Sequence, residues 1–288
     1  MRVIFVPVAD RPECAVMLNT AFTLGHTVGA SVIGCHIRPH GDSPVTLPST
    51  LGLLGLTNEE AAWQAASKPQ DAEMTRIAAK VLFTQLAERH GYDLLGRPRA
   101  KPGAVWMEKT GSPNKVLGIM GPVADLLVVS RPSLSKGGTL ARLFLSASLL
   151  KSSRPVLVLP QAKKRTVGKR ICIAWNQSVE AAQAVAAAMS LLVQADRVVI
   201  VSCGAEKRAG PKSSQLAAYL KYWGIKSEHV STRGNDEPKE ILTTYKSTGS
   251  DLLLMGAYSR NKMNRLVFGG VTEYMLKRAS VPILMLHT

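Results

Sequence analysis

Two glycine-containing segments near the end of the chain have the residue types and the spacing of a phosphate-binding turn. The segment Met255–Ser259 reads Met-Gly-Ala-Tyr-Ser, and Gly269–Thr272, reading Gly-Gly-Val-Thr, follows after nine further residues. The first segment closes the apolar run Asp251–Met255, and the second opens a helical pattern. Glycine lets the backbone approach a ligand closely, and the unpaired N–H groups at a helix start face an anion. The pattern indicates phosphate binding, with simple turn and capping glycines as the alternative interpretation.

The composition is that of an α/β protein. The chain has 288 residues, of which 46% are hydrophobic and only 5% aromatic, and its Val/Ile/Leu runs are short. Parallel strands are buried on both faces and therefore look continuously apolar. No apolar run is long enough to span a membrane. The N-terminus leads directly into the strand pattern Arg2–Val6 with no signal core, so we expect a soluble cytoplasmic protein without a membrane partner.

Charge and cysteine usage exclude several classes. The net charge of +16 is scattered, and its densest cluster, Lys163–Arg170, lies in the expected interdomain linker, so a nucleic-acid partner is not expected. The four cysteines form no C-x-x-C pair and predict neither a zinc site nor disulfides. We interpret them as buried core thiols.

The chain contains an internal repeat. The segment Ala124–Val129 resembles Ser250–Met255, 126 residues later, and each is followed by a proline-led strand. At the front ends, Asp10 corresponds to Asn176 with an offset of 166 residues. The difference of 40 residues locates an insertion in the first copy. A tandem duplication explains these offsets better than a single large domain.

These offsets predict two domains. We expect a first domain over residues 1–160, with a helical insertion at about 38–102, a linker over 161–168, and a second domain over 169–288. The insertion contains a long helical stretch around Asn58–His90, whose apolar residues Ile77, Val81, Leu82, Leu86 and Ala87 suggest core packing. In the second copy, strands alternate with helices, the first helix covering about Val179–Ala195. Alternating βα units predict a doubly wound parallel sheet, which binds ligands where the strand order reverses.

Five βα units of this size, a polar residue after strand one, and a G-x-x-G-(nine residues)-G-(S/T) signature after strand four resemble the universal stress protein family. The likeness covers essentially the whole chain as two tandem domains and is strongest over Asp251–His287. It implies a Rossmann-like fold with strand order 3-2-1-4-5 and a nucleotide cleft between strands one and four. The implied cofactor is ATP, which can be bound with or without a magnesium ion.

The resemblance also implies site residues. In ATP-binding members, the end of strand one and the end of strand two hold the adenosine, and the glycine signature wraps the phosphates. The matching positions are Ala174 and Asn176 after strand one, Cys203 after strand two, and Met255, Gly256, Ser259, Gly269, Gly270, Val271 and Thr272 in the signature. Three of them depart from the family pattern. Asn176 replaces an acid, Ser259 replaces a glycine, and Gly270 replaces a Ser/Thr while keeping its backbone N–H.

The first copy keeps Asp10 but loses the signature. Ser130–Pro132 stands where the signature should open, Arg142 and Leu143 stand where it should close, and Gly137–Gly138 has the wrong spacing. The resemblance therefore implies that this copy does not bind a nucleoside triphosphate in the family manner. We expect it to serve domain packing, with the proline-led strands pairing the two copies as a pseudo-dimer. Homodimerisation is left open.

No catalytic pattern accompanies the glycine signature. The histidines have no metal-ligand spacing, and His36 is interpreted as a packed or capping residue. Gly204–Ser213 has the wrong spacing for a Walker loop. Fast ATP hydrolysis would lack its usual groups. The leading hypothesis is a stress-response protein that binds or senses an adenine nucleotide. A nucleotide-independent scaffold is the alternative, and slow ATPase or nucleotidyl-transfer chemistry is a third possibility.

Overall fold

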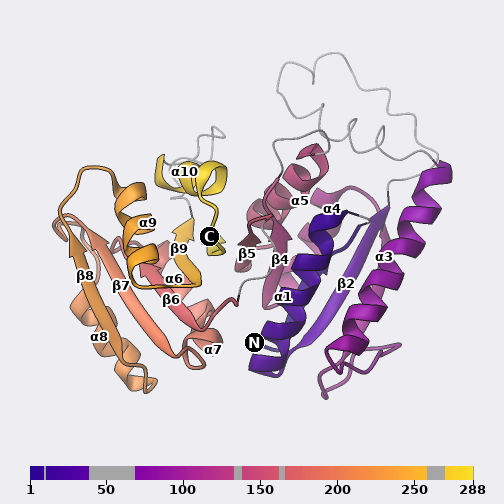
Figure 1. Ribbon diagram of the computed structural model, residues 1–288, viewed down its shortest axis with the longest axis horizontal. Helices are drawn as coiled ribbons and strands as arrows, with labels where there is room; N and C mark the ends of the chain where they lie inside the picture. Colours follow the sequence, from indigo (N-terminus) through magenta and orange to yellow (C-terminus); the bar gives the residue numbers. More distant parts are fainter. Residues whose placement is uncertain (10, 39–68, 133–137, 162–165, 258–269, 288) are drawn as a thin grey trace, which may run out of the picture. The chain divides into compact units, whose positions relative to one another are not determined.

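The chain divides into two compact units, each containing its own set of parallel strands. The computed structural model describes residues 1–9, 11–38, 69–132, 138–161, 166–257 and 270–287 (Figure 1). One unit comprises Arg2–Ser152, and the other comprises Ser153–Thr288 together with Met1. None of the described helices is both long and apolar enough to cross a membrane.

The first unit is a parallel sheet with strand order β3-β2-β1-β4. Its elements are β1 (Val3–Pro7), α1 (Pro12–Val28), β2 (Ser31–Arg38), α3 (Pro69–Arg89), β3 (Ala104–Thr110), α4 (Pro113–Met120), the short 3-10 helix η2 (Gly121–Val123), β4 (Leu126–Ser130) and α5 (Gly138–Lys151). The central strands β1 and β4 are buried almost throughout, as their unbroken apolar sequences predict.

The second unit repeats this architecture. Its elements are β5 (Val156–Leu159), β6 (Arg170–Ala174), α6 (Val179–Ala187), α7 (Met189–Leu192), β7 (Arg197–Cys203), α8 (Ser213–Tyr222), β8 (Ser227–Thr232), α9 (Glu237–Ser247), β9 (Leu252–Ala257), α10 (Gly270–Arg278) and β10 (Ile283–His287). Strands β8-β7-β6-β9-β10 lie in this order and are parallel, so the predicted order 3-2-1-4-5 is confirmed here. The predicted fold class is confirmed as well.

The proline-led strands pair with each other. Strand β5 runs antiparallel to β10, with Leu157 opposite Leu284. Because of this pairing β5 groups with the second unit, whereas the sequence had placed residues 154–159 in a first domain ending at 160. Whether two chains associate stays a prediction.

The predicted long helices differ in detail from the observed ones. The helix expected over about Val179–Ala195 is interrupted at Ala188, where α6 ends and α7 begins, and nothing in the local sequence explains the break. In the first unit α3 begins at Pro69, and residues 58–68 lie outside the described residues.

The predicted buried face of α3 was partly wrong. Leu86 and Ala87 are buried, but Ile77 and Val81 are each about half exposed. The buried anchor is instead Phe83, which lies against β2 where a Cβ on Gly34 would come within 2.5 Å of its ring. The sequence pattern did not single out Phe83.

In each unit, the aspartate just before the fourth strand accepts hydrogen bonds from the backbone at the start of the first strand. In the first unit, Asp125 Oδ2 accepts hydrogen bonds from the backbone N–H groups of Arg2 and Val3, at 2.6 and 2.9 Å. In the second, Asp251 accepts from the three N–H groups of residues 168–170, at 2.9 to 3.2 Å. The two residues that revealed the repeat therefore have the same structural role.

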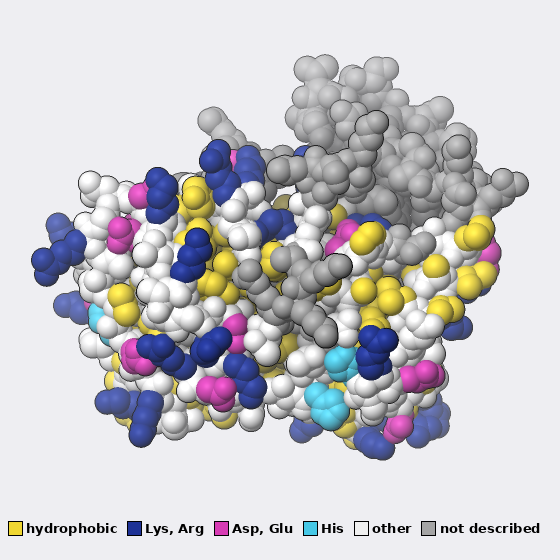
Figure 2. Space-filling model, viewed as in Figure 1, with side chains coloured by type: hydrophobic (Ala, Val, Ile, Leu, Met, Phe, Trp, Pro, Cys, Tyr) yellow, Lys and Arg dark blue, Asp and Glu magenta, His cyan; other side chains and the backbone are white. Residues whose placement is uncertain are grey.

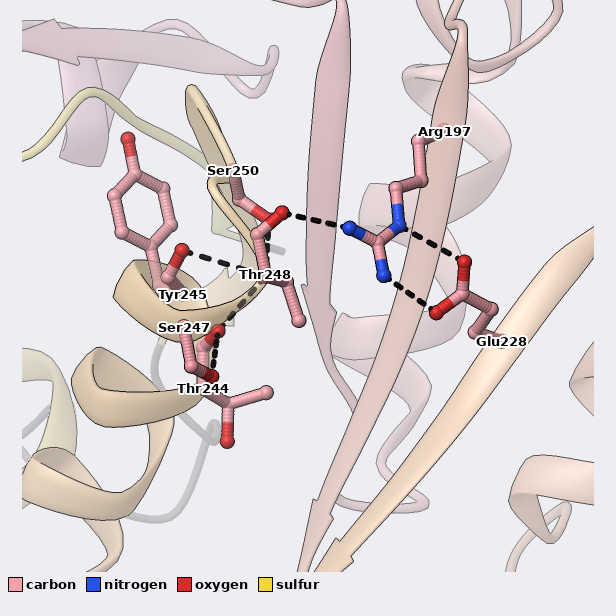
Figure 3. Close-up of polar contacts among 7 residues, drawn as sticks. All are labelled: Arg197, Glu228, Thr244, Tyr245, Ser247, Thr248 and Ser250. Carbon is pink, nitrogen blue, oxygen red and sulfur yellow. Dashed lines mark hydrogen bonds and ion pairs between the residues drawn. The ribbon is translucent and has the colours of Figure 1, made fainter.

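A second polar cluster fixes α9 to the amino-terminal ends of β7 and β8 (Figure 3). Arg197 donates from Nε and Nη2 to both carboxylate oxygens of Glu228, at 2.8 and 2.7 Å, and from Nη1 to the carbonyl of Thr248, at 3.0 Å. The hydroxyl of Thr248 donates to the carbonyl of Thr244 at 2.7 Å. These contacts lie at the opposite ends of the strands from the candidate site described below.

Candidate functional site

The second unit has a pocket at the point where its strand order reverses. Strand β6 is flanked by β7 on one side and β9 on the other, and the carboxyl ends of all three contribute to a cavity of about 320 Å³. In doubly wound sheets this is the place where ligands bind. The volume lies at the lower end of the range found for small-molecule sites.

Most of the predicted site residues line this pocket. Those brought together are Ala174, Asn176, Cys203, Met255, Gly256, Gly270, Val271 and Thr272. Ser259 and Gly269 lie outside the described residues. The contacts of these side chains with a ligand stay predictions.

The turn after β6 sets the position of Asn176. Its side-chain Oδ1 accepts from the backbone N–H of Ser178 at 3.2 Å, and the Ser178 hydroxyl accepts from the N–H of Ala181 at 3.1 Å, capping α6. Asn176 is exposed at the pocket rim. Because its oxygen is used in this turn, its amide nitrogen is the group suited to a ligand.

Two glycines of the signature have different physical roles. A Cβ on Gly256 would lie 2.6 Å from the backbone N of Ala181 and 2.7 Å from the carbonyl carbon of Glu180. Glycine is therefore required here so that β9 can pack against the start of α6. Among the described residues, a Cβ on Gly270 would meet nothing within 4 Å, so none of them requires glycine at the start of α10.

Several pocket residues were not found from the sequence. Gln177, Glu180, Glu206, Arg208 and Glu237 all line the cavity. They lie in the loops after β6 and β7 and in the first turns of α6 and α9, with no spacing that marks a motif. Gln177 could not have been singled out, because its unusual left-handed backbone, with φ of 61°, is visible only in the structure.

The charges around the described part of the pocket are mixed. Glu180, Glu206 and Glu237 are acidic, and Arg208 is basic. Glu206 has a structural role, because its Oε1 accepts a hydrogen bond of 2.7 Å from the N–H of Ser213 at the start of α8. Among the described residues, no group of three or more His, Cys, Asp or Glu side chains is placed to hold a metal ion.

Cys203 is the one described cysteine that is not buried, which corrects the expectation of four core thiols. Burial raises the pKa of Cys35 and of Cys172 to about 12, and it also raises the pKa of Cys203. Thiolates are the reactive form, so all of these groups react slowly at neutral pH.

We expect iodoacetamide at mildly alkaline pH to alkylate Cys203 first, because it is accessible from the pocket. Peptide mass spectrometry of the native protein would identify the modified site, and Cys203→Ser should then remain almost unlabelled. Early modification of Cys14 or Cys172 would contradict the structure. A ligand in the pocket should slow the alkylation.

The first unit has no matching signature among its described residues. Asp10 and Gly137 lie outside them, and Arg142 and Leu143 lie within α5. Burial lowers the pKa of Arg131 to about 10.

His36 is a packed residue, as predicted: it is buried, its Nδ1 lies 3.1 Å from the carbonyl of Val8, and its ring stacks on Trp106.

Positive charge does not gather into one stripe on the face shown in Figure 2. Within each unit, Lys and Arg side chains are interspersed with acidic and uncharged ones. This view agrees with the scattered charge of the sequence.

The fold and the pocket together define a doubly wound α/β domain with a cavity at the point where its strand order reverses. Residues 168–287 match the universal stress protein family. The second domain therefore belongs to that family, as its glycine signature predicted.

Solved structures extend the likeness of fold to both units. A universal stress protein from Archaeoglobus fulgidus DSM 4304 is 15% identical, with a TM-score of 0.68 over 99% of this chain and 97% of its own. A functionally unknown protein from Pseudomonas aeruginosa PAO1 is 12% identical, with a TM-score of 0.56 over 99% and 92%. This near-complete coverage agrees with the predicted tandem layout. No curated protein matches the sequence.

Proposed function

We propose that this is a cytoplasmic stress-response protein whose second domain binds an adenine nucleotide, with ATP as the first ligand to test. The observation that carries this proposal is the convergence of the predicted positions on one pocket, from three separate strand ends and the start of α10.

The pocket lining suits the parts of a nucleotide. Val201, Ile241 and Met255 offer apolar surface for a base. The N–H groups at the start of α10 suit an anion, since the first N–H groups of a helix have no intrahelical acceptor. The carboxylates of Glu180 and Glu237 suit the hydroxyl groups of a ribose better than they suit phosphates.

Substitutions at Gly270 test the proposal with little disturbance of the fold, because a Cβ there meets no atom of the described residues within 4 Å. Gly270→Asp places a negative charge at the helix start and should weaken ATP binding by about tenfold. Gly270→Ser supplies the hydroxyl of the family pattern and should tighten binding by about fivefold, the worth of one hydrogen bond. Isothermal titration calorimetry on the full chain measures both.

A single site per chain is the expected stoichiometry, because the first unit lacks the signature. Thermal melting of each variant serves as the folding control. Equal affinities for Gly270→Asp and Gly270→Ser would show that the phosphates do not reach α10. An absence of binding by the unmodified protein, with and without magnesium, would favour the alternative function.

That alternative is a nucleotide-independent interaction scaffold. The antiparallel pairing of β5 with β10 supports it, because these proline-led strands already use their edges for packing between repeats. Slow ATPase chemistry is the third possibility, and magnesium-dependent product formation would be required to establish it.

A further inference from the structure

Arg208 places a weakly hydrogen-bonded guanidinium at the pocket wall. It lies in the loop between β7 and α8 and lines the cavity. Its Nη1 donates to the carbonyl of Asn176 at 3.5 Å, which is the limit of a hydrogen bond. Within the described part of the chain it forms no ion pair, although Glu180, Glu206 and Glu237 line the same cavity.

The backbone of Arg208 is held firmly, in contrast to its side chain. Gln177 Oε1 accepts from the N–H of Arg208 at 3.2 Å, and Gln177 Nε2 donates to the carbonyls of Arg208 and Gly210, at 3.2 and 3.0 Å. Gln177 is only 6% exposed. One amide side chain therefore fixes the loop after β7 to the turn after β6.

Two further features show that this attachment is tight. A Cβ on Gly210 would lie 2.0 Å from the carbonyl oxygen of Gln177, so the loop lies directly against that turn. Trp175 Nε1 donates to the carbonyl of Pro211 at 2.9 Å. Gln177 itself stays in a left-handed backbone conformation, which is unfavourable for a residue with a side chain. The clamp offsets that cost.

A fixed backbone that carries a free guanidinium at a pocket wall is an arrangement suited to an anionic ligand. Guanidinium groups bind phosphate through paired N–H donors, and less ordering entropy is lost when the supporting chain is already held in place. The other charged residues in the described wall of the pocket are carboxylates. Arg208 is therefore the cation in that wall that can attract a phosphate.

We infer that Arg208 contacts the phosphates of the bound nucleotide and makes the pocket select nucleotides over nucleosides, and that Gln177 is the residue that positions it. This inference rests on the proposed function and adds to the predicted site two residues outside the glycine signature.

The test compares ATP with adenosine on the full chain by isothermal titration calorimetry. Arg208→Gln should weaken ATP binding about tenfold and leave adenosine binding within twofold, because a charge-assisted hydrogen bond to phosphate is lost. Arg208→Lys should recover part of the loss. Lys207→Gln is the matched control: it removes the same charge from an exposed neighbour that does not line the pocket, and it should change neither affinity.

Gln177→Gly separates positioning from folding. Glycine adopts the left-handed backbone without strain, so this variant loses the clamp while keeping the turn. We expect several-fold weaker ATP binding, unchanged adenosine binding and a melting temperature near that of the unmodified protein.

The outcomes are distinct. If Arg208→Gln leaves ATP affinity unchanged, the inference is wrong while the proposed function stands. If ATP and adenosine lose affinity equally, Arg208 packs against the base, and the inference is again wrong. If the unmodified protein binds neither ligand, the proposed function fails and this inference fails with it.

Discussion

Asp251→Ala is expected to lower the free energy of unfolding of the second domain by about 3 kcal/mol, because three backbone N–H groups lose their acceptor. Asp251 is only 7% exposed, and one of its donors, Gly168, is also buried. Water therefore replaces the lost acceptor incompletely. Burial raises the pKa of Asp251, so removing the carboxylate also removes a desolvation cost, which keeps the loss moderate.

Hydrogen exchange followed by mass spectrometry would locate the effect. Peptides from β6 and β9 should lose protection, whereas peptides from β1 should be unchanged. Asp125→Ala is the matched control in the other repeat: it removes two hydrogen bonds from a half-buried site, so a smaller loss confined to the first unit is expected. An equal loss of protection in both units from either variant would contradict these separate roles.

The second large effect is expected at Gly256. Gly256→Ala should destabilise the second domain by about 2 to 3 kcal/mol, because the new methyl group overlaps the backbone at the start of α6 and must push the helix from β9. Urea denaturation followed by tryptophan fluorescence, in a background where Trp175 beside the pocket is retained and the other three tryptophans are replaced by phenylalanine, would measure the loss.

Gly270→Ala provides the contrast, because a Cβ at that position meets nothing within 4 Å in the described part of the chain. Alanine is a better helix former than glycine, so at this first position of α10 the variant should be neutral or slightly stabilising. If both alanine variants were neutral, Gly256 would not be a packing glycine. If both were destabilising, the start of α10 would be more crowded than described.

The internal repeat allowed much of the fold to be predicted. Asp125 and Asp251 are 126 residues apart, occupy equivalent places and make equivalent backbone hydrogen bonds. Alternating βα units and buried apolar runs were sufficient to predict parallel sheets and, with the family resemblance, the strand order of the second unit. These predictions succeeded because strand burial and βα alternation are local properties of the sequence.

Helix faces were harder to predict. In α3, the apolar residues Ile77 and Val81 fit a helical stripe but remain half exposed, whereas Phe83 forms the contact with β2. The periodicity of a helix shows that one side is apolar. It does not show which part of that side meets the sheet, since this depends on how β2 and α1 present their surfaces.

The sequence by itself determined the tandem α/β architecture, the family of the second domain and the strand ends that form its pocket. Each follows from short segments whose order and spacing fix their place in a parallel sheet. Only the tertiary structure decided that Gly256 serves helix packing and that Gln177 clamps Arg208 at the pocket wall. Those roles depend on contacts between residues far apart in the chain, 31 residues for Gln177 and Arg208, and such contacts leave no periodic pattern in the sequence.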